Sequence, residues 1–132
     1  MEPLLQPVAD RRDGLVHACL IWAALFGRTF SYKEIGTLLG ETDPLALSRV
    51  VGGALERISL LERGRGRPLL GALVVTAGSG LPGAAFFRLA ARLGVFSRNP
   101  GRLEKERFWA LEKERIRACW RPGAAPLPGE TD

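Results

Sequence analysis

Apolar residues recur at three- and four-residue spacing in several segments of the chain, and this pattern predicts amphipathic helices. The first segment follows Asp10 and Asp13, either of which can cap a helix, and it runs to about Phe26 before Gly27 ends it. The expected apolar face of this helix, which we take to be buried, is formed by Leu15, Cys19, Trp22 and Phe26.

Capping signals delimit the next two helices. Ser31 followed by Glu34 has the spacing of a capping box, and Gly40 stops the short apolar pattern that follows. Asp43 and Pro44 start a third helix, because proline is tolerated in the first helical turn. Its apolar positions continue at helical spacing from Leu47 to Ile58.

The second half of the chain predicts a strand and two more helices. Alternating arginine and glycine at 63–68 indicate a loop, the apolar segment 69–76 predicts a strand, and 77–80 predicts a turn. Helices are expected at about 83–93 and 102–120. In the last helix the residues expected to pack on the domain are Leu103, Phe108, Leu111 and Cys119.

Helix, short helix, helix, strand and turn is the order found in winged-helix domains. We therefore expect a mainly α fold, a winged helix-turn-helix with a short strand or wing element and one or two extra C-terminal helices. A length of 132 residues, 46% of them hydrophobic, suits a single domain. The expected organisation is an N-terminal arm at 1–9, one domain at 10–121 and a Pro/Gly-rich disordered tail at 122–132.

The charge balance favours an anionic partner. The net charge is +5, and the segment 86–121 holds ten basic residues against four glutamates. No apolar run approaches the length that crosses a bilayer, and the N-terminus lacks the pattern of a secretory signal. We therefore expect a cytoplasmic protein without a membrane partner.

Residue types needed for metal binding or catalysis are sparse. Cys19 and Cys119 lie far apart, without a second pair that would make a disulfide framework or a zinc site. His17 is the only histidine, and no ligand residue stands at metal-binding spacing from it. These observations predict no metal, no cofactor and no general-base chemistry.

Two motifs carry a resemblance to a known family. Ser31-Tyr32-Lys33-Glu34-Ile35 and Ser48-Arg49-Val50-Val51-Gly52-Gly53-Ala54-Leu55 resemble segments of the alkylguanine-DNA alkyltransferases. In that family the first segment opens the second helix of a winged helix-turn-helix, and the second forms the helix that enters the minor groove of DNA. The resemblance implies that Tyr32 helps to rotate a nucleotide out of the stack and that Arg49 fills the gap.

The reactive motif of that family is missing. Where the family carries Pro-Cys-His-Arg before two valines, this chain has Leu70-Gly71-Ala72-Leu73 before Val74-Val75. Neither glycine nor alanine offers a nucleophile, so self-alkylation is excluded under this alignment. The chain then resembles the alkyltransferase-like proteins, which bind DNA without alkyl transfer, although those proteins usually keep the Pro-x-His-Arg frame.

We therefore expect a non-catalytic protein that binds double-stranded DNA, including distorted or modified DNA. The expected nucleic-acid-binding residues are Tyr32, Lys33, Ser48, Arg49, Gly52, Gly53, Arg63, Arg65 and Arg67. A packing role for Tyr32 and a solvated position for the arginines are the alternatives. The alternative function is a protein-interaction adaptor, or an accessory subunit of a nucleic-acid-processing complex, with helix 102–120 and its aromatic residues holding the partner.

Overall fold

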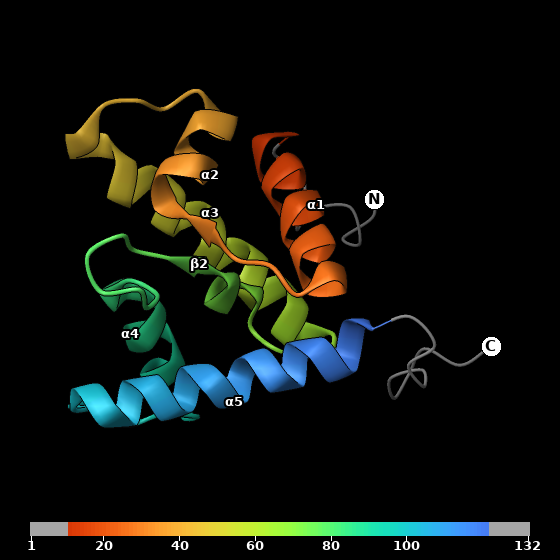
Figure 1. Cartoon of the computed structure of the whole chain (residues 1–132), viewed down its shortest axis with the longest axis vertical. Coiled ribbons are helices and arrows are strands. Elements are labelled where there is room, and N and C mark those ends of the chain that lie inside the picture. Colours follow the sequence, from red (N-terminus) through yellow and green to blue (C-terminus); the bar gives the residue numbers. More distant parts are fainter. Residues whose placement is uncertain (1–10, 122–132) are drawn as a thin grey trace.

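The computed structural model describes residues 11–121, so the expected arm at 1–9 and tail at 122–132 lie outside the described residues. In the described part, five α-helices surround a very short sheet of two strands (Figure 1). The elements are α1 (Arg11–Phe26), β1 (Phe30–Ser31), α2 (Tyr32–Leu39), α3 (Pro44–Gly64), the 3₁₀ helix η2 (Leu70–Leu73), β2 (Val74–Val75), α4 (Ala84–Arg92) and α5 (Arg102–Trp120). The expected mainly α fold with a small strand element and two C-terminal helices is confirmed.

The predicted caps fix the starts of α2 and α3. The Ser31 hydroxyl accepts from the Glu34 N–H at 3.0 Å, and the Glu34 carboxylate accepts from the Ser31 N–H at 2.8 Å. Asp43 caps α3 by accepting from the Leu45 N–H at 3.0 Å. Helix α3 then continues past Ile58 to Gly64, so the first residues of the expected arginine loop are helical.

The strand expected at 69–76 is mostly a 3₁₀ helix. Only Val74 and Val75 form a strand, which pairs in parallel with Phe30 and Ser31 of β1. Side chains from other helices satisfy the preceding backbone donors: the Leu69 N–H donates to Glu112 at 2.8 Å, and the Gly71 N–H donates to Ser59 at 3.0 Å. Because these backbone donors already have partners, they do not need the hydrogen bonds of a longer pair of strands.

The buried face of α1 differs from the one expected. The core takes Val16, Leu20, Ala23 and Ala24, whereas Leu15, Trp22 and Phe26 are 49%, 46% and 62% exposed and Cys19 is half-buried. Helix α1 is apolar on nearly every side, so its hydrophobic pattern alone does not choose the inward face.

Two polar contacts on the inner side of α1 settle its rotation. Arg57 of α3 binds the buried Asp13 carboxylate through two hydrogen bonds of 2.6 and 2.9 Å. One helical turn later, His17 lies 2.7 Å from the buried carboxylate of Glu62. A buried charge is costly unless it is paired, so these contacts favour the rotation that faces Asp13 and His17 toward α3.

Helix α5 crosses beneath the other helices in Figure 1. Its buried residues are Phe108, Glu112 and Ile116, while the expected packing residues Leu103 and Leu111 face solvent and Cys119 is half-buried. Glu112 belongs to the inner face because it accepts the Leu69 N–H. The sequence pattern could not show this, because a glutamate normally marks an outer face.

The aromatic residues of α5 anchor this helix to the domain. Phe108 is buried, and the half-buried Trp109 donates its indole N–H to the Ala72 carbonyl at 2.8 Å. The half-buried ring of Trp120 packs beneath the guanidinium of Arg67, 5.1 Å away. These three side chains therefore do not form the exposed aromatic patch that the adaptor alternative placed on this helix.

Candidate nucleic-acid interface

A groove of about 520 Å³ opens between α3, the start of α2 and the start of α4. Five of the residues expected to bind nucleic acid line it together: Tyr32, Ser48, Arg49, Gly52 and Gly53. The sequence motifs at 31–35 and 48–55 therefore meet on one surface. We call this surface the α3 groove.

Helical spacing in α3 places four of these residues, Ser48, Arg49, Gly52 and Gly53, outward. Val51, Ala54 and Leu55 are buried, and the intervening positions face the groove. A Cβ added at Gly52 would meet no atom within 4 Å outside its own helical neighbourhood. Packing inside the protein therefore does not require glycine there, although glycine in a helix costs about 1 kcal/mol relative to alanine. The surface of the groove is therefore low at Gly52, where no side chain stands above the helix backbone.

Tyr32 forms one wall of the α3 groove. Its ring is half-buried, and its hydroxyl lies 2.9 Å from the position of a Cβ built on Gly83, at the start of α4. Burial raises the pKa of Tyr32, and the nearby positive charge of Arg88 offsets part of that rise. The tyrosine is therefore neutral at physiological pH and packed in place.

The charge of the α3 groove is positive. Arg49 and Arg88 are both exposed, and neither has an ion pair with any residue in the range 11–121. Glu56 is the carboxylate that lines the groove, and Arg92 binds it at 2.9 Å. An anion entering the groove therefore meets two guanidinium groups that no carboxylate of the described chain neutralises.

Arg88 and Thr76 are groove residues that sequence reasoning missed. Arg88 lies on α4, far along the chain from Arg49, and only the packing of α4 against α3 brings the two to one surface. The excess of basic residues after Phe86 was the one sequence signal that included Arg88. Charge counting does not indicate which of those basic residues share a face.

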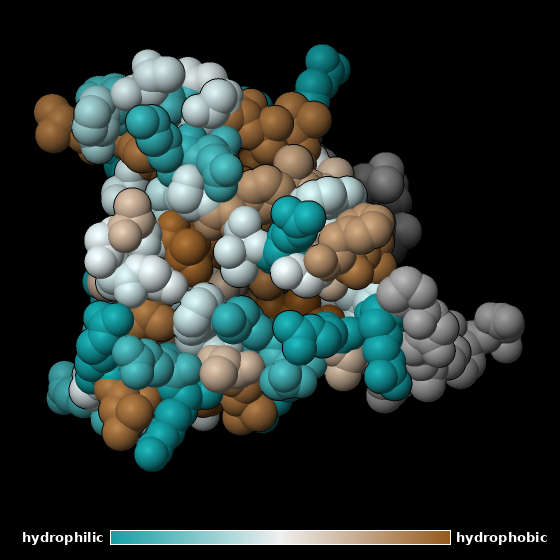
Figure 2. All heavy atoms as spheres, in the orientation of Figure 1, coloured by the Kyte–Doolittle hydropathy of each residue, from teal (hydrophilic) through white to brown (hydrophobic). Residues whose placement is uncertain are grey.

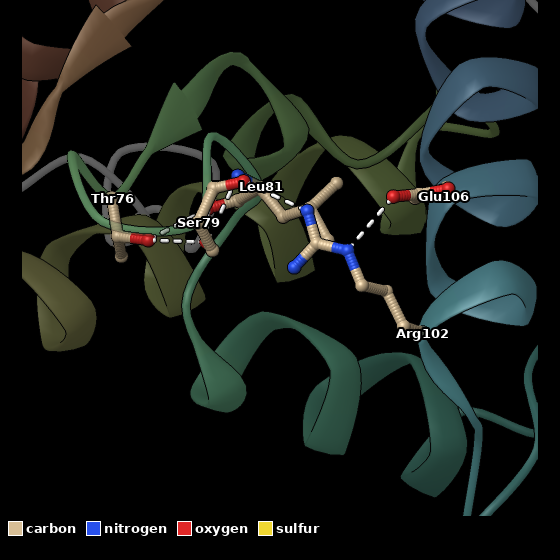
Figure 3. Close-up of polar contacts among 5 residues, drawn as sticks. All are labelled: Thr76, Ser79, Leu81, Arg102 and Glu106. Atoms are coloured by element: carbon tan, nitrogen blue, oxygen red, sulfur yellow. Dashed lines mark hydrogen bonds and ion pairs between the residues drawn. The ribbon is translucent and has the colours of Figure 1, made fainter.

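The turn between β2 and α4 forms the rim of the groove and makes hydrogen bonds on two sides. The Thr76 N–H donates to the Leu81 carbonyl at 2.9 Å, and the hydroxyls of Thr76 and Ser79 lie 2.6 Å apart (Figure 3). From α5, Arg102 donates to the Ser79 carbonyl at 3.2 Å while also binding Glu106 at 2.9 Å. The rim next to Thr76 is therefore fixed by the turn itself and by α5.

The three arginines at 63–67 lie away from the α3 groove, at the other end of α3. A helical rise of 1.5 Å per residue places Arg65 about 24 Å from Arg49 along the helix axis. Arg67 is largely buried and binds Glu62 at 2.6 Å, whereas Arg63 and Arg65 are exposed. Lys33 is exposed in the first turn of α2 beside Tyr32, without lining the groove.

Gly71 stands where the resemblance would require the reactive cysteine. A Cβ at this position would lie 2.9 Å from the Ser59 hydroxyl and 3.4 Å from the Phe86 ring. The hollow beside it, between α3 and α4, has about 10 Å³ of free volume, which holds at most about one water molecule. Neither a larger side chain nor an extruded nucleobase fits there without rearrangement.

The part of the chain that the structure describes contains neither a candidate metal site nor a membrane-spanning helix. Within 11–121, no three His, Cys, Asp or Glu side chains are grouped so that they could hold a metal ion. No helix in the same range has the length and apolar character needed to cross a bilayer. No family model, curated protein or solved structure matches this chain.

Proposed function

We propose that this protein is a non-catalytic DNA-binding module that docks duplex DNA, including distorted or modified duplexes, on the α3 groove. The observation that carries the proposal is the convergence of Arg49, Gly52 and Arg88 on one surface. Two guanidinium groups without a carboxylate partner in the described chain flank a helix segment that has no side chains to hold a ligand away. A phosphodiester backbone has the matching charge and approaches such a surface closely.

The arginines and the tyrosine of the groove, and Lys33 beside it, take roles that follow from their positions. Arg49 projects from the N-terminal half of α3, the part of a helix-turn-helix recognition helix that contacts base edges. Arg88 on α4 and Lys33 on α2 flank it and contact phosphates, which position the protein on the duplex without reading its sequence. Tyr32 supports this surface as a packed wall and does not need to move.

The surroundings of Gly71 support recognition without an extruded base. A nucleotide rotated into the protein needs a pocket of its own size, and the hollow at Gly71 is far smaller. Neither cysteine lines the α3 groove, since Cys19 lies on α1 and Cys119 on α5. We propose that a distorted duplex is recognised through its shape and flexibility, and that the protein leaves it chemically unchanged.

Fluorescence anisotropy with labelled oligonucleotides tests the proposal. The probes are a single strand, a matched duplex and the same duplex with one alkylguanine. We expect duplex binding by the unaltered protein and a loss of about 1–3 kcal/mol of binding free energy for Arg49→Ala. Arg65→Ala is the matched control because it removes the same charge from the far end of α3. Equal losses for both variants, or no binding of any probe, would refute the proposal.

A further inference from the structure

Glu56 is the only carboxylate among the described residues that line the α3 groove. It stands on the same face of α3 as Arg49, about two helical turns further along, and Gly52 and Gly53 lie between them. The rim opposite α3 adds no charge, because residues 76–85 contain no acidic or basic side chain. In Figure 2 pale side chains of intermediate hydropathy lie over this turn between β2 and α4. Glu56 therefore places one negatively charged acceptor in a groove whose other charges are positive.

The ion pair of Glu56 with Arg92 is too exposed to contribute much to stability. Oε2 of Glu56 accepts a hydrogen bond from the Arg92 guanidinium at 2.9 Å, and the two side chains are 41% and 59% exposed. Water solvates and screens both charges of such a pair, so its net contribution is small. A negative charge in this groove also opposes the approach of phosphates. Glu56 therefore lowers the affinity for duplex DNA in general and adds little to the fold.

The second oxygen of Glu56 is available to a ligand. Within residues 11–121, Oε1 of Glu56 accepts no hydrogen bond, although each oxygen of a carboxylate can accept. The preceding helical turn, at Gly52 and Gly53, has no side chains that hold a base edge away. Arg92 offsets the charge of Glu56 from the α4 side, which makes the carboxylate less unfavourable beside a polyanion.

We propose that Glu56 is a specificity-determining residue of the α3 groove, and that its free oxygen accepts a hydrogen bond from the exocyclic amino group of a G·C base pair. The inference rests on the proposed function, because it requires a duplex in the groove. On the major-groove edge this amino group is N4 of cytosine, with which glutamate pairs, and on the minor-groove edge it is N2 of guanine. An A·T pair presents only acceptors in the minor groove, where the carboxylate finds no donor.

Arg49 and Glu56 then read different base pairs. A helical rise of 1.5 Å per residue separates them by about 10 Å along the axis of α3, and successive base pairs are about 3.4 Å apart. Arg49 supplies donors and Glu56 supplies an acceptor, so one base pair does not have to satisfy both. Part of the selectivity comes from repulsion, because a sequence without the amino group leaves the carboxylate facing other acceptors.

Fluorescence anisotropy at one fixed salt concentration tests this role of Glu56. The probes are three duplexes of equal length, built from alternating G·C, I·C or A·T pairs. We expect the unaltered protein to prefer the G·C duplex to the A·T duplex, and Glu56→Ala to reduce this ratio of affinities roughly tenfold. Inosine lacks the N2 amino group of guanine. Weak binding of the I·C duplex therefore assigns the contact to guanine, and binding equal to that of the G·C duplex assigns it to cytosine.

Arg92→Ala is the matched control, because it removes the ion pair and keeps the carboxylate. It should weaken binding of all three duplexes alike and leave the ratio of G·C to A·T affinity unchanged; circular dichroism checks that both variants fold. The inference is overturned if the ratio falls as far in Arg92→Ala as in Glu56→Ala, or if the unaltered protein does not prefer G·C. Absence of binding to every duplex would overturn the proposed function and this inference together. Duplex binding with an unchanged ratio in Glu56→Ala would overturn this inference alone.

Discussion

The imidazole of His17 on α1 lies 2.7 Å from the fully buried carboxylate of Glu62 on α3, whose other oxygen accepts a hydrogen bond from Arg67 at 2.6 Å. Burial alone raises the pKa of Glu62, but the hydrogen bonds and charges of His17 and Arg67 outweigh it and lower the pKa below its ordinary value. One buried carboxylate thereby joins α1, α3 and the loop that follows α3.

A dependence of stability on pH follows from the lowered pKa. A carboxyl that is more acidic in the folded state stabilises the fold above its unfolded pKa, about 4.3, and this contribution is lost as the pH falls through the lower, folded-state pKa. We expect the melting temperature of Glu62→Gln to fall less between neutral and acidic pH than the melting temperature of the unaltered protein does. The control is Glu114→Gln, which alters an exposed pair with Arg117. Unchanged acid sensitivity in Glu62→Gln would contradict this account.

Arg67 and Arg65 should behave differently although they stand two positions apart. Arg67→Ala leaves part of the buried Glu62 charge unpaired, and we expect a loss of about 3 kcal/mol in the free energy of unfolding. Arg65→Ala removes an exposed side chain and should change it by less than about 0.5 kcal/mol. Urea denaturation measures both values. Equal small effects would show that Arg67 is not part of the core.

The apolar packing of α5 on the other helices predicts that α5 unfolds together with the rest of the domain, in one transition. Ile116 is 1% exposed, so Ile116→Ala should cost about 2–5 kcal/mol of unfolding free energy. Leu111→Ala, on the outer side of the same helix, should cost less than about 1 kcal/mol. A single unfolding transition is expected for both. If Ile116→Ala were as mild as Leu111→Ala, the packing of α5 described above would be wrong.

The substitution Gly52→Ala should have opposite effects on the stability of the fold and on duplex binding. Because nothing inside the protein opposes a Cβ there, we expect Gly52→Ala to raise the free energy of unfolding by up to about 1 kcal/mol. The added methyl group lies in the α3 groove, so duplex affinity should fall. Thermal melting and anisotropy measure the two effects on the same sample. A variant that is stabilised and binds as before would remove Gly52 from the interface.

The parts of the fold that could be predicted from the sequence are those settled by near neighbours. Ser31 and Asp43 cap helices through bonds to backbone groups two or three residues away, so their spacing alone was sufficient. The rotation of α1 depended instead on Arg57 and Glu62, more than forty residues along the chain. The 3₁₀ helix η2 depended on acceptors contributed by α3 and α5.

The same distinction applies to the candidate site. Arg49 and Gly52 share a face because helical geometry places them there, and α2 is adjacent in the chain. Arg88 joins them only through the packing of α4, which no local pattern encodes. The contacts of Arg67 with Glu62 and with the ring of Trp120 are likewise set by the fold, and the sequence pattern does not indicate them.

The salt dependence of duplex binding, compared between two double variants, tests the central claim most directly. Each phosphate contact contributes about 0.9 to the slope of log affinity against log salt concentration. Arg49→Ala with Arg88→Ala should weaken binding and lower the slope by about one to two units, whereas Arg63→Ala with Arg65→Ala, the same change in charge, should leave both nearly as they were. An equal or larger loss in the second double variant, or no salt-dependent duplex binding by the unaltered protein, would contradict the assignment of the α3 groove as a DNA interface.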